Sequence, residues 1–299
     1  MKQLAIIGPT ASGKSDLAIK TAKEIDAYIL SIDSLSIYKE IDIVAAKPSK
    51  EELNAVRHFG IDELYPNQHF SVEIFIQLYQ EVLKQCQTDK KNLIIVGGTS
   101  FYLKSLLDGL SPLPPITTQT QRSVSDKLKE LDESYQFLYA KDKAYMQKIA
   151  KNDRYRIEKA LLIYEASGLT PSEWFSANPP KPIITDLPVF NIDVEREVLR
   201  QRIEKRTQQM YAMGLIDEVA YLEQKYTRAP NAMKAIGIVE VLDFLDDKTD
   251  KNEMLSLIST HTAQLAKRQQ TFNRTQFGDI EHAKLEELQG LILHRLAHT

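Results

Sequence analysis

Residues 4–15 read Leu-Ala-Ile-Ile-Gly-Pro-Thr-Ala-Ser-Gly-Lys-Ser, an apolar run followed directly by a glycine-rich loop. The loop matches G-x-x-x-x-G-K-[ST], a pattern that places backbone N–H groups around phosphates between a buried strand and a helix. A turn that binds nothing is the alternative, and the strand before and helix after the loop disfavour it. We therefore expect a diphosphate or triphosphate to contact Gly8, Pro9, Thr10, Ala11, Ser12, Gly13, Lys14 and Ser15, with Mg²⁺ on the Ser15 hydroxyl.

Composition limits the class of protein. The chain has 299 residues, 43% hydrophobic and 26% charged, as in an ordinary globular protein of one or two domains. Its net charge of −3 excludes a basic surface along the whole molecule, so any nucleic-acid contact must be local. The single cysteine, Cys86, excludes an internal disulfide and is expected to be a buried filler. Neither a signal peptide nor a membrane-length apolar stretch is found, so we expect a cytoplasmic protein without membrane contact.

The first part of the chain alternates strand and helix patterns. Strands are predicted at 4–7, 27–32 and 92–96, and helices at 16–26, 72–87 and about 100–107. This order predicts an α/β fold, a P-loop NTPase-like parallel sheet flanked by helices.

Two proline clusters divide the rest of the chain. Between residues 112–115 and 179–182 only helical patterns occur, and a strand is predicted to return at 188–193. Helices are expected at 195–213, 216–226 and 251–272, whereas the tail from 280 to 299 carries no clear signal. We therefore predict a P-loop α/β core at 1–115, a helical insertion at 116–182, and a return strand with C-terminal helices at 183–299 that complete the core.

Asp33 follows the second predicted strand, where ligands bind in open α/β sheets. Most P-loop hydrolases carry an acid at the end of a later strand, but here that strand ends in Gly97-Gly98-Thr99. This arrangement favours transfer to a bound acceptor, with Asp33 as general base and Ser34 or Thr99 as orienting hydroxyls. A role for Asp33 as a cap or turn residue remains open.

Several cations follow on the later helices. Arg202 and Arg206 lie beside an apolar stripe on the helix from 195, so each needs a partner, either a bound phosphate or a core carboxylate. Lys267, Arg268 and Arg274 form either an anion-binding patch or a solvated face.

Together these stretches resemble the tRNA dimethylallyltransferases, also called tRNA isopentenyltransferases, over roughly residues 4–277. The motifs that carry the resemblance are GPTASGKS at 8–15, DSLSIYKEIDIVAAKP at 33–48, GGTSFYLKSLL at 97–107, NDRYRIEKAL at 152–161, Arg202-Ile203 with Arg206, Met210 and Gly214, AIGIVE at 235–240 and AKRQQTF at 266–272. The resemblance implies transfer of a dimethylallyl group from dimethylallyl diphosphate to N6 of the adenosine next to a tRNA anticodon, position 37.

The resemblance also implies roles for single residues. Asp33 would be the catalytic base, Thr99 would contact the reacting centre, and Arg202 would serve the diphosphate. Mg²⁺ on Ser15 would help to neutralise that leaving group. Contacts with the tRNA anticodon stem-loop would come from Asp33, Ser34, Leu35, Ser36, Thr99, Arg122, Tyr155, Arg156, Ile157, Glu158 and Lys159, with the helical insertion clasping the stem-loop and the target base flipped out. This sequence departs from the family's usual residues at Lys159, Ile238 and Phe272. These departures are expected to affect contacts with tRNA more than the chemical step.

Three other functions remain open. The chain could be an adenylate dimethylallyltransferase acting on free AMP or ATP, an ATP-dependent kinase of a small metabolite, or a nucleotide-binding module without chemistry. The predicted insertion favours tRNA over a free nucleotide. A monomer is expected.

Overall fold

The structure is a computed structural model that describes residues 1–278 and 280–298, and it consists of two compact units. The first unit comprises Met1–Leu106 and the chain from Ile184 onward, and the second comprises Leu107–Ile183. The second unit is thus inserted in the first along the chain, and the insertion expected at 116–182 falls within it.

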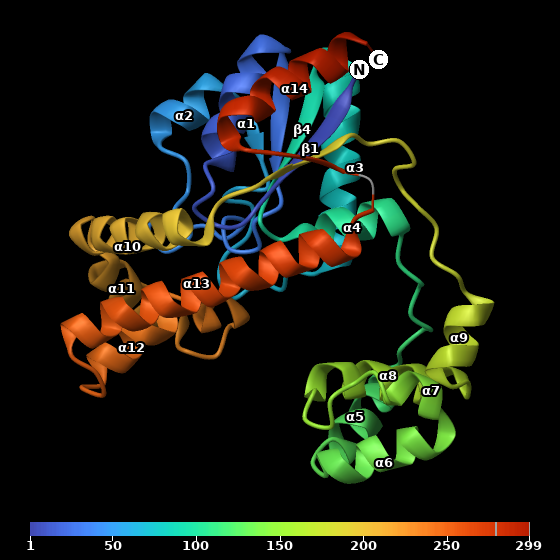
Figure 1. The fold of residues 1–299 in the computed structure, drawn as a ribbon. Coiled ribbons are helices and arrows are strands. Elements are labelled where there is room, and N and C mark those ends of the chain that lie inside the picture. Colours follow the sequence, from blue (N-terminus) through green and yellow to red (C-terminus); the bar gives the residue numbers. More distant parts are fainter. Residues whose placement is uncertain (279, 299) are drawn as a thin grey trace. The chain divides into compact units, whose positions relative to one another are not determined.

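A six-stranded parallel sheet forms the centre of the first unit (Figure 1). Its strands are β1 (Gln3–Ile7), β2 (Ala27–Ser31), β3 (His58–Phe59), β4 (Asn92–Gly97), β5 (Val189–Ile192) and β6 (Glu281–Ala283), in the order β3-β2-β4-β1-β5-β6. The predicted parallel α/β fold is confirmed. Because β1 lies between β4 and β5, the phosphate loop emerges near the middle of the sheet.

Helices surround this sheet and continue beyond it. They are α1 (Lys14–Glu24), α2 (Lys50–Ala55), α3 (Val72–Asp89), α4 (Ser100–Asp108), α10 (Arg196–Ala212), α11 (Leu215–Tyr226), the 3₁₀ helix η1 (Asn231–Lys234), α12 (Ile238–Leu245), α13 (Lys251–Gln276) and α14 (Leu285–Ala297). Leu17 and Ala18 of α1 and Leu288 of α14 pack on Leu4 and Ile6 of β1, while α3 contacts β2 and β4. Each long strand therefore reads as a nearly continuous apolar run.

The C-terminal tail corrects one prediction. Residues 280–298 form β6 and α14, although the sequence there predicts no clear element. Leu288, Ile292 and Leu296 recur every four residues and are buried against the sheet. A helical period is therefore present in the sequence, but it extends over only three turns. The elements α2, β3 and α12 were also not predicted, because a two-residue strand and single-turn or double-turn helices carry too little periodicity.

The second unit is helical throughout. In residues 107–183, all of which the structure describes, α5 (Thr118–Lys127), α6 (Leu131–Lys141), α7 (Lys143–Met146), α8 (Arg154–Ser167) and α9 (Pro171–Ala177) occur without a strand. Val124, Leu138 and Leu161 belong to its own apolar core. Gly109 has φ +78°, and a Cβ there would lie 2.0 Å from the Lys181 carbonyl oxygen, so only glycine fits where the two connecting segments meet.

Two compositional expectations can be checked on the described residues. Cys86 is fully buried, and burial raises the pKa of its thiol to about 11, so it is an inert packing residue as predicted. None of the helices described here is both long and apolar enough to cross a bilayer.

Candidate active site

The phosphate loop occupies residues 8–15 between β1 and α1. Gly13 has φ +90°, and a Cβ at this position would lie 2.7 Å from a methyl carbon of Leu285, so glycine is required. Lys14 is the first residue of α1, and its Nζ donates to the Pro9 carbonyl oxygen at 3.1 Å. The ammonium thus folds back over the loop at a helix N-terminus, which is a preformed anion site.

Ser34, the residue after Asp33, and Thr99 lie close together because β2 and β4 are neighbours in the parallel sheet. The Thr99 hydroxyl accepts from the Ser34 backbone N–H at 3.3 Å and donates to the Ser34 Oγ at 3.4 Å. The sequence therefore pointed to residues that the sheet does bring together at its carboxyl edge.

Asp33 has the geometry of a turn residue. Its Oδ1 accepts from the backbone N–H groups of Leu35 at 2.9 Å and Ser36 at 3.4 Å, which makes it a turn residue. Within the described chain no hydrogen bond reaches its Oδ2. One oxygen shapes the turn while the other can take part in chemistry.

Two cations share a small cavity with Asp33. The cavity, of about 80 Å³, is lined by Thr10, Lys14, Ser15, Asp33 and Arg206 among others. Burial lowers the pKa of Lys14 to about 8, opposed by the Asp33 carboxylate and assisted by Arg206. Burial also lowers the pKa of Arg206, again opposed by Asp33. One carboxylate therefore faces two partly desolvated cations, which favours binding of a further anion.

The two arginines of α10 contact the phosphate loop at different points. Arg206 donates to the Thr10 hydroxyl at 3.4 Å, and Arg202 donates to the Ser12 carbonyl oxygen at 3.4 Å. Arg202 lines a separate cavity of about 800 Å³ together with Arg274 and Lys284. Arg206, for which the sequence predicts a bound phosphate or a core carboxylate as partner, is thus the arginine beside Asp33.

Gln269 of α13 was not singled out from the sequence. Its Oε1 accepts from the Thr10 backbone N–H at 2.8 Å, and its Nε2 donates to the Gly98 carbonyl oxygen at 3.0 Å. A Cβ at Gly98 would lie 2.4 Å from this amide, which explains the glycine. Gln269 therefore joins the phosphate loop to the loop that carries Thr99. In the sequence, the only feature that could have pointed to Gln269 is its position within the AKRQQTF motif.

The remaining predicted contacts lie in the second unit. Arg122 is exposed on α5, and Tyr155 and Arg156 are exposed in the first turn of α8. Lys159 Nζ lies 5.5 Å from the centre of the Tyr155 ring. Ile157 is fully buried in the core of this unit, so its side chain packs inside the protein instead of facing a ligand.

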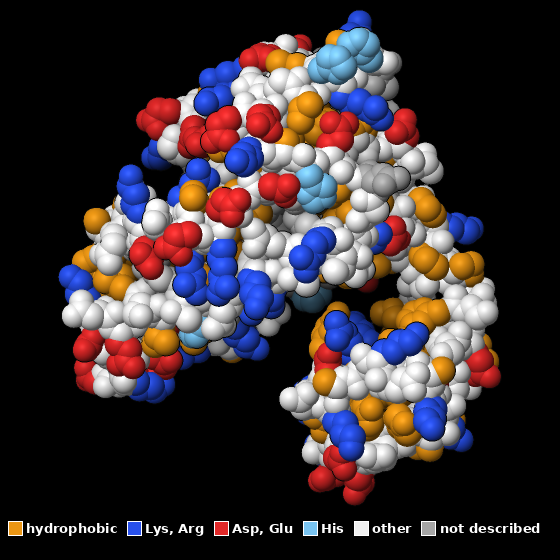
Figure 2. Space-filling view, viewed as in Figure 1, with side chains coloured by type: hydrophobic (Ala, Val, Ile, Leu, Met, Phe, Trp, Pro, Cys, Tyr) orange, Lys and Arg blue, Asp and Glu red, His pale blue; other side chains and the backbone are white. Residues whose placement is uncertain are grey.

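Charge gathers on one face of the first unit. Figure 2 shows lysine and arginine side chains over α10 and α13, where a groove of about 1060 Å³ is lined by Arg196, Arg200, Lys205 and Lys267. Glu204 lines the same groove. The chain, although acidic overall, thus presents a local cationic surface.

The fit of a magnesium ion can be judged from the donor set. Ser15 offers a hydroxyl in the cavity that also holds Lys14 and Asp33. No cluster of three His, Cys, Asp or Glu side chains suited to a metal occurs in the part of the chain that the structure describes. Mg²⁺ is commonly bound by one or two protein oxygens plus substrate phosphates, so this donor set fits an ion that arrives with a diphosphate.

Comparison with known proteins was made for the whole chain. Residues 36–276 match the family model described as IPP transferase. The tRNA dimethylallyltransferase of Sulfurimonas denitrificans is 64% identical over 297 residues, covering 99% of this chain and 100% of the relative.

Solved structures are also similar. The tRNA delta(2)-isopentenylpyrophosphate transferase of Staphylococcus epidermidis is 30% identical, with a TM-score of 0.70 over 100% of this chain and 98% of that chain. A eukaryotic dimethylallyltransferase acting on tRNA has a TM-score of 0.84 at 23% identity, over 99% of this chain and 78% of that chain, which is a likeness of fold.

Proposed function

The chain belongs to the IPP transferase family, and from this premise we propose how its residues transfer a dimethylallyl group from dimethylallyl diphosphate to N6 of adenosine 37 in tRNA. The protein is a transferase that modifies tRNA. The observation that carries the proposed mechanism is the common cavity of Lys14, Arg206 and Asp33, which pairs an anion site with a carboxylate.

The diphosphate of the donor binds the loop at 8–15. As the allylic C–O bond breaks, the electron pair leaves with the diphosphate, and charge grows on its oxygens. Lys14 and the α1 N-terminus stabilise that charge, with Arg206 and Arg202 adjacent to the loop. The Ser15 hydroxyl would hold a Mg²⁺ ion that arrives with the diphosphate, and such an ion would neutralise part of the same charge.

The acceptor amine needs a base. The N6 lone pair is delocalised into the adenine ring, so attack on the allylic carbon is assisted when a proton leaves N6. The proton passes to Oδ2 of Asp33, while Oδ1 keeps the turn bonds to Leu35 and Ser36. The N6–C bond forms, the C–O bond breaks, and diphosphate and protonated Asp33 result.

The turn after β2, residues 33–36, binds the acceptor nucleotide. Ser34 and Thr99 already hydrogen-bond to each other, so both hydroxyls lie at the edge where the adenosine must enter. Flipping the base out of its stack brings N6 to Asp33.

We assign the RNA backbone to two cationic surfaces. The first is the α10–α13 groove with Lys267 and Arg200, and the second is the helical unit with Arg122, Tyr155 and Lys159. Arg156 and Glu158 lie in the same first turns of α8. Since tRNA is the substrate, we place the protein in the cytoplasm, working as a monomer.

One experiment separates this function from its alternatives. Purified protein is incubated with Mg²⁺, dimethylallyl diphosphate and an unmodified anticodon stem-loop, with AMP, ATP and radiolabelled ATP plus small metabolites in parallel. Modification of the stem-loop adenosine alone, read by nucleoside mass analysis, is expected. Modification of AMP or ATP instead indicates the adenylate enzyme, and phosphate transfer from ATP indicates a kinase.

A further inference from the structure

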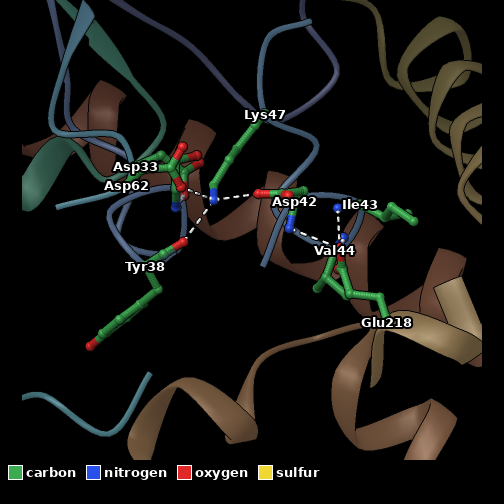
Figure 3. Close-up of polar contacts among 9 residues, drawn as sticks. Asp33, Tyr38, Asp42, Ile43, Val44, Lys47, Asp62 and Glu218 are labelled. Carbon is green, nitrogen blue, oxygen red and sulfur yellow. Dashed lines mark hydrogen bonds and ion pairs between the residues drawn. The ribbon is translucent and has the colours of Figure 1, made fainter. Parts of the chain in front are cut away.

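Glu218 of α11 binds the segment that follows the Asp33 turn. Its Oε2 accepts from the backbone N–H groups of Asp42 at 2.9 Å and Ile43 at 2.8 Å, and its Oε1 accepts from Val44 at 2.9 Å (Figure 3). One carboxylate thus satisfies three consecutive amides that lie about 175 residues earlier in the chain. Such a set of charge-assisted bonds fixes the path of residues 42–44.

Lys47 continues this connection. Its side chain is only 5% exposed, and its Nζ donates to Asp42 Oδ1 at 2.7 Å, to Asp62 Oδ1 at 2.5 Å and to the Tyr38 carbonyl oxygen at 2.7 Å (Figure 3). All three ammonium hydrogens are therefore used, as a buried cation requires. Asp42 joins the two groups, because its backbone N–H donates to the Glu218 carboxylate while its own carboxylate accepts from Lys47.

From Lys47 the contacts reach Asp33. The Asp62 backbone N–H donates to the Ser36 carbonyl oxygen at 3.2 Å, and Tyr38 N–H donates to the Leu35 carbonyl oxygen at 3.1 Å. Leu35 and Ser36 are the residues whose N–H groups hold Asp33 Oδ1. A continuous series of hydrogen bonds thus runs from α11 to the Asp33 carboxylate.

Packing supports the same connection. Ile37, Ile41 and Val44 belong to one apolar cluster with Leu215 and Val219 of α11. A Cβ at Gly237, before α12, would lie 3.1 Å from a Val44 methyl carbon. Residues 37–44 are therefore held by the C-terminal helices, both through apolar contacts and through Glu218. The phosphate loop is held separately, by Arg206 of α10 and Gln269 of α13.

We propose that Glu218 is a positioning residue for Asp33: by holding residues 42–44 and, through Asp42, Lys47, it sets the direction of the Asp33 carboxylate toward the acceptor amine. This inference rests on the proposed function of Asp33 as base. Glu218 and Lys47 do not belong to the lining of the cavity that holds Lys14 and Asp33, as far as the described residues define it, so their effect is indirect.

The test is Glu218→Gln, which keeps the size but replaces one accepting oxygen with an amide that opposes the backbone N–H groups. Its kcat for prenylation of the stem-loop is expected to fall about tenfold to a hundredfold, with KM for dimethylallyl diphosphate unchanged. Glu218→Asp, which retains a carboxylate, is expected to recover part of the loss. Glu223→Gln is the matched control, because it lies on the same helix and pairs with Arg228.

A double-mutant cycle separates positioning from general destabilisation. If Glu218 acts through Asp33, Glu218→Gln adds little to the loss already caused by Asp33→Asn. Wild-type kcat in Glu218→Gln, or losses that multiply in the double variant, would overturn the inference. Absence of stem-loop prenylation by the wild-type protein would instead contradict the proposed function, so the two failures are distinguishable.

Discussion

The Lys14 ammonium and the Asp33 carboxylate line the same cavity, where burial lowers the pKa of Lys14 to about 8 although the Asp33 carboxylate acts in the opposite direction. The donor site of the free protein is therefore cationic below that pH and loses charge above it. A bound diphosphate favours the charged form, so donor binding and protonation of Lys14 are linked.

This linkage predicts an alkaline limb in the pH profile. The kcat/KM for dimethylallyl diphosphate is expected to fall above about pH 8, because neutral Lys14 cannot pair with the diphosphate. In Lys14→Arg the guanidinium stays charged, so the limb moves to above about pH 10 although the rate is lower. Profiles of both proteins, measured with saturating stem-loop, check this. A limb near the same pH in both would show that another group is responsible.

Asp33→Asn separates the two roles of this side chain. The amide oxygen can still accept from Leu35 and Ser36, so the turn and the melting temperature are expected to persist. Removal of the base lowers kcat by about 10²- to 10⁴-fold. Donor affinity, measured by calorimetry with Mg²⁺ and dimethylallyl diphosphate, should change little. Turnover close to the wild-type value would exclude Asp33 as the base.

Gln269→Ala tests the link between the phosphate loop and the Thr99 loop. The change removes the bonds to Thr10 and Gly98, which together contribute roughly 1–3 kcal/mol. We expect kcat/KM to fall about tenfold or more, since both loops lose their common partner. Gln276→Ala, at an exposed position of the same helix, is the control and should leave kcat/KM unchanged. If both variants had the same kcat/KM, Gln269 would contribute only to packing and not to the arrangement of the two loops.

The sequence predicted most of the sheet and the position of the site for a physical reason. Long apolar runs and the glycine loop are local signals, and parallel pairing then brings Asp33 and Thr99 to one edge. Gln269 and Glu218 were missed because their partners lie 259 and 174 residues away along the chain, where no local pattern records them. Lys47 was missed although its partners lie 5 to 15 residues away, because no helix or strand period places them in contact. The buried stripe of α14, Leu288, Ile292 and Leu296, was missed because three further leucines at 285, 291 and 293 obscure the helical period within its thirteen residues.

The cationic groove between α10 and α13 makes a prediction about salt. Lys267→Ala removes one charge from the groove and is expected to raise KM for the stem-loop several-fold at about 0.1 M salt, with kcat at saturation unchanged. Because each phosphate contact releases counterions, the slope of log KM against log salt should decrease by roughly 0.7–0.9. Lys248→Ala is the control, since Lys248 is already paired with Asp243 and Asp246. A Lys267 variant with an unchanged slope would mean that RNA does not reach this groove, and the helical unit would then carry the backbone contacts.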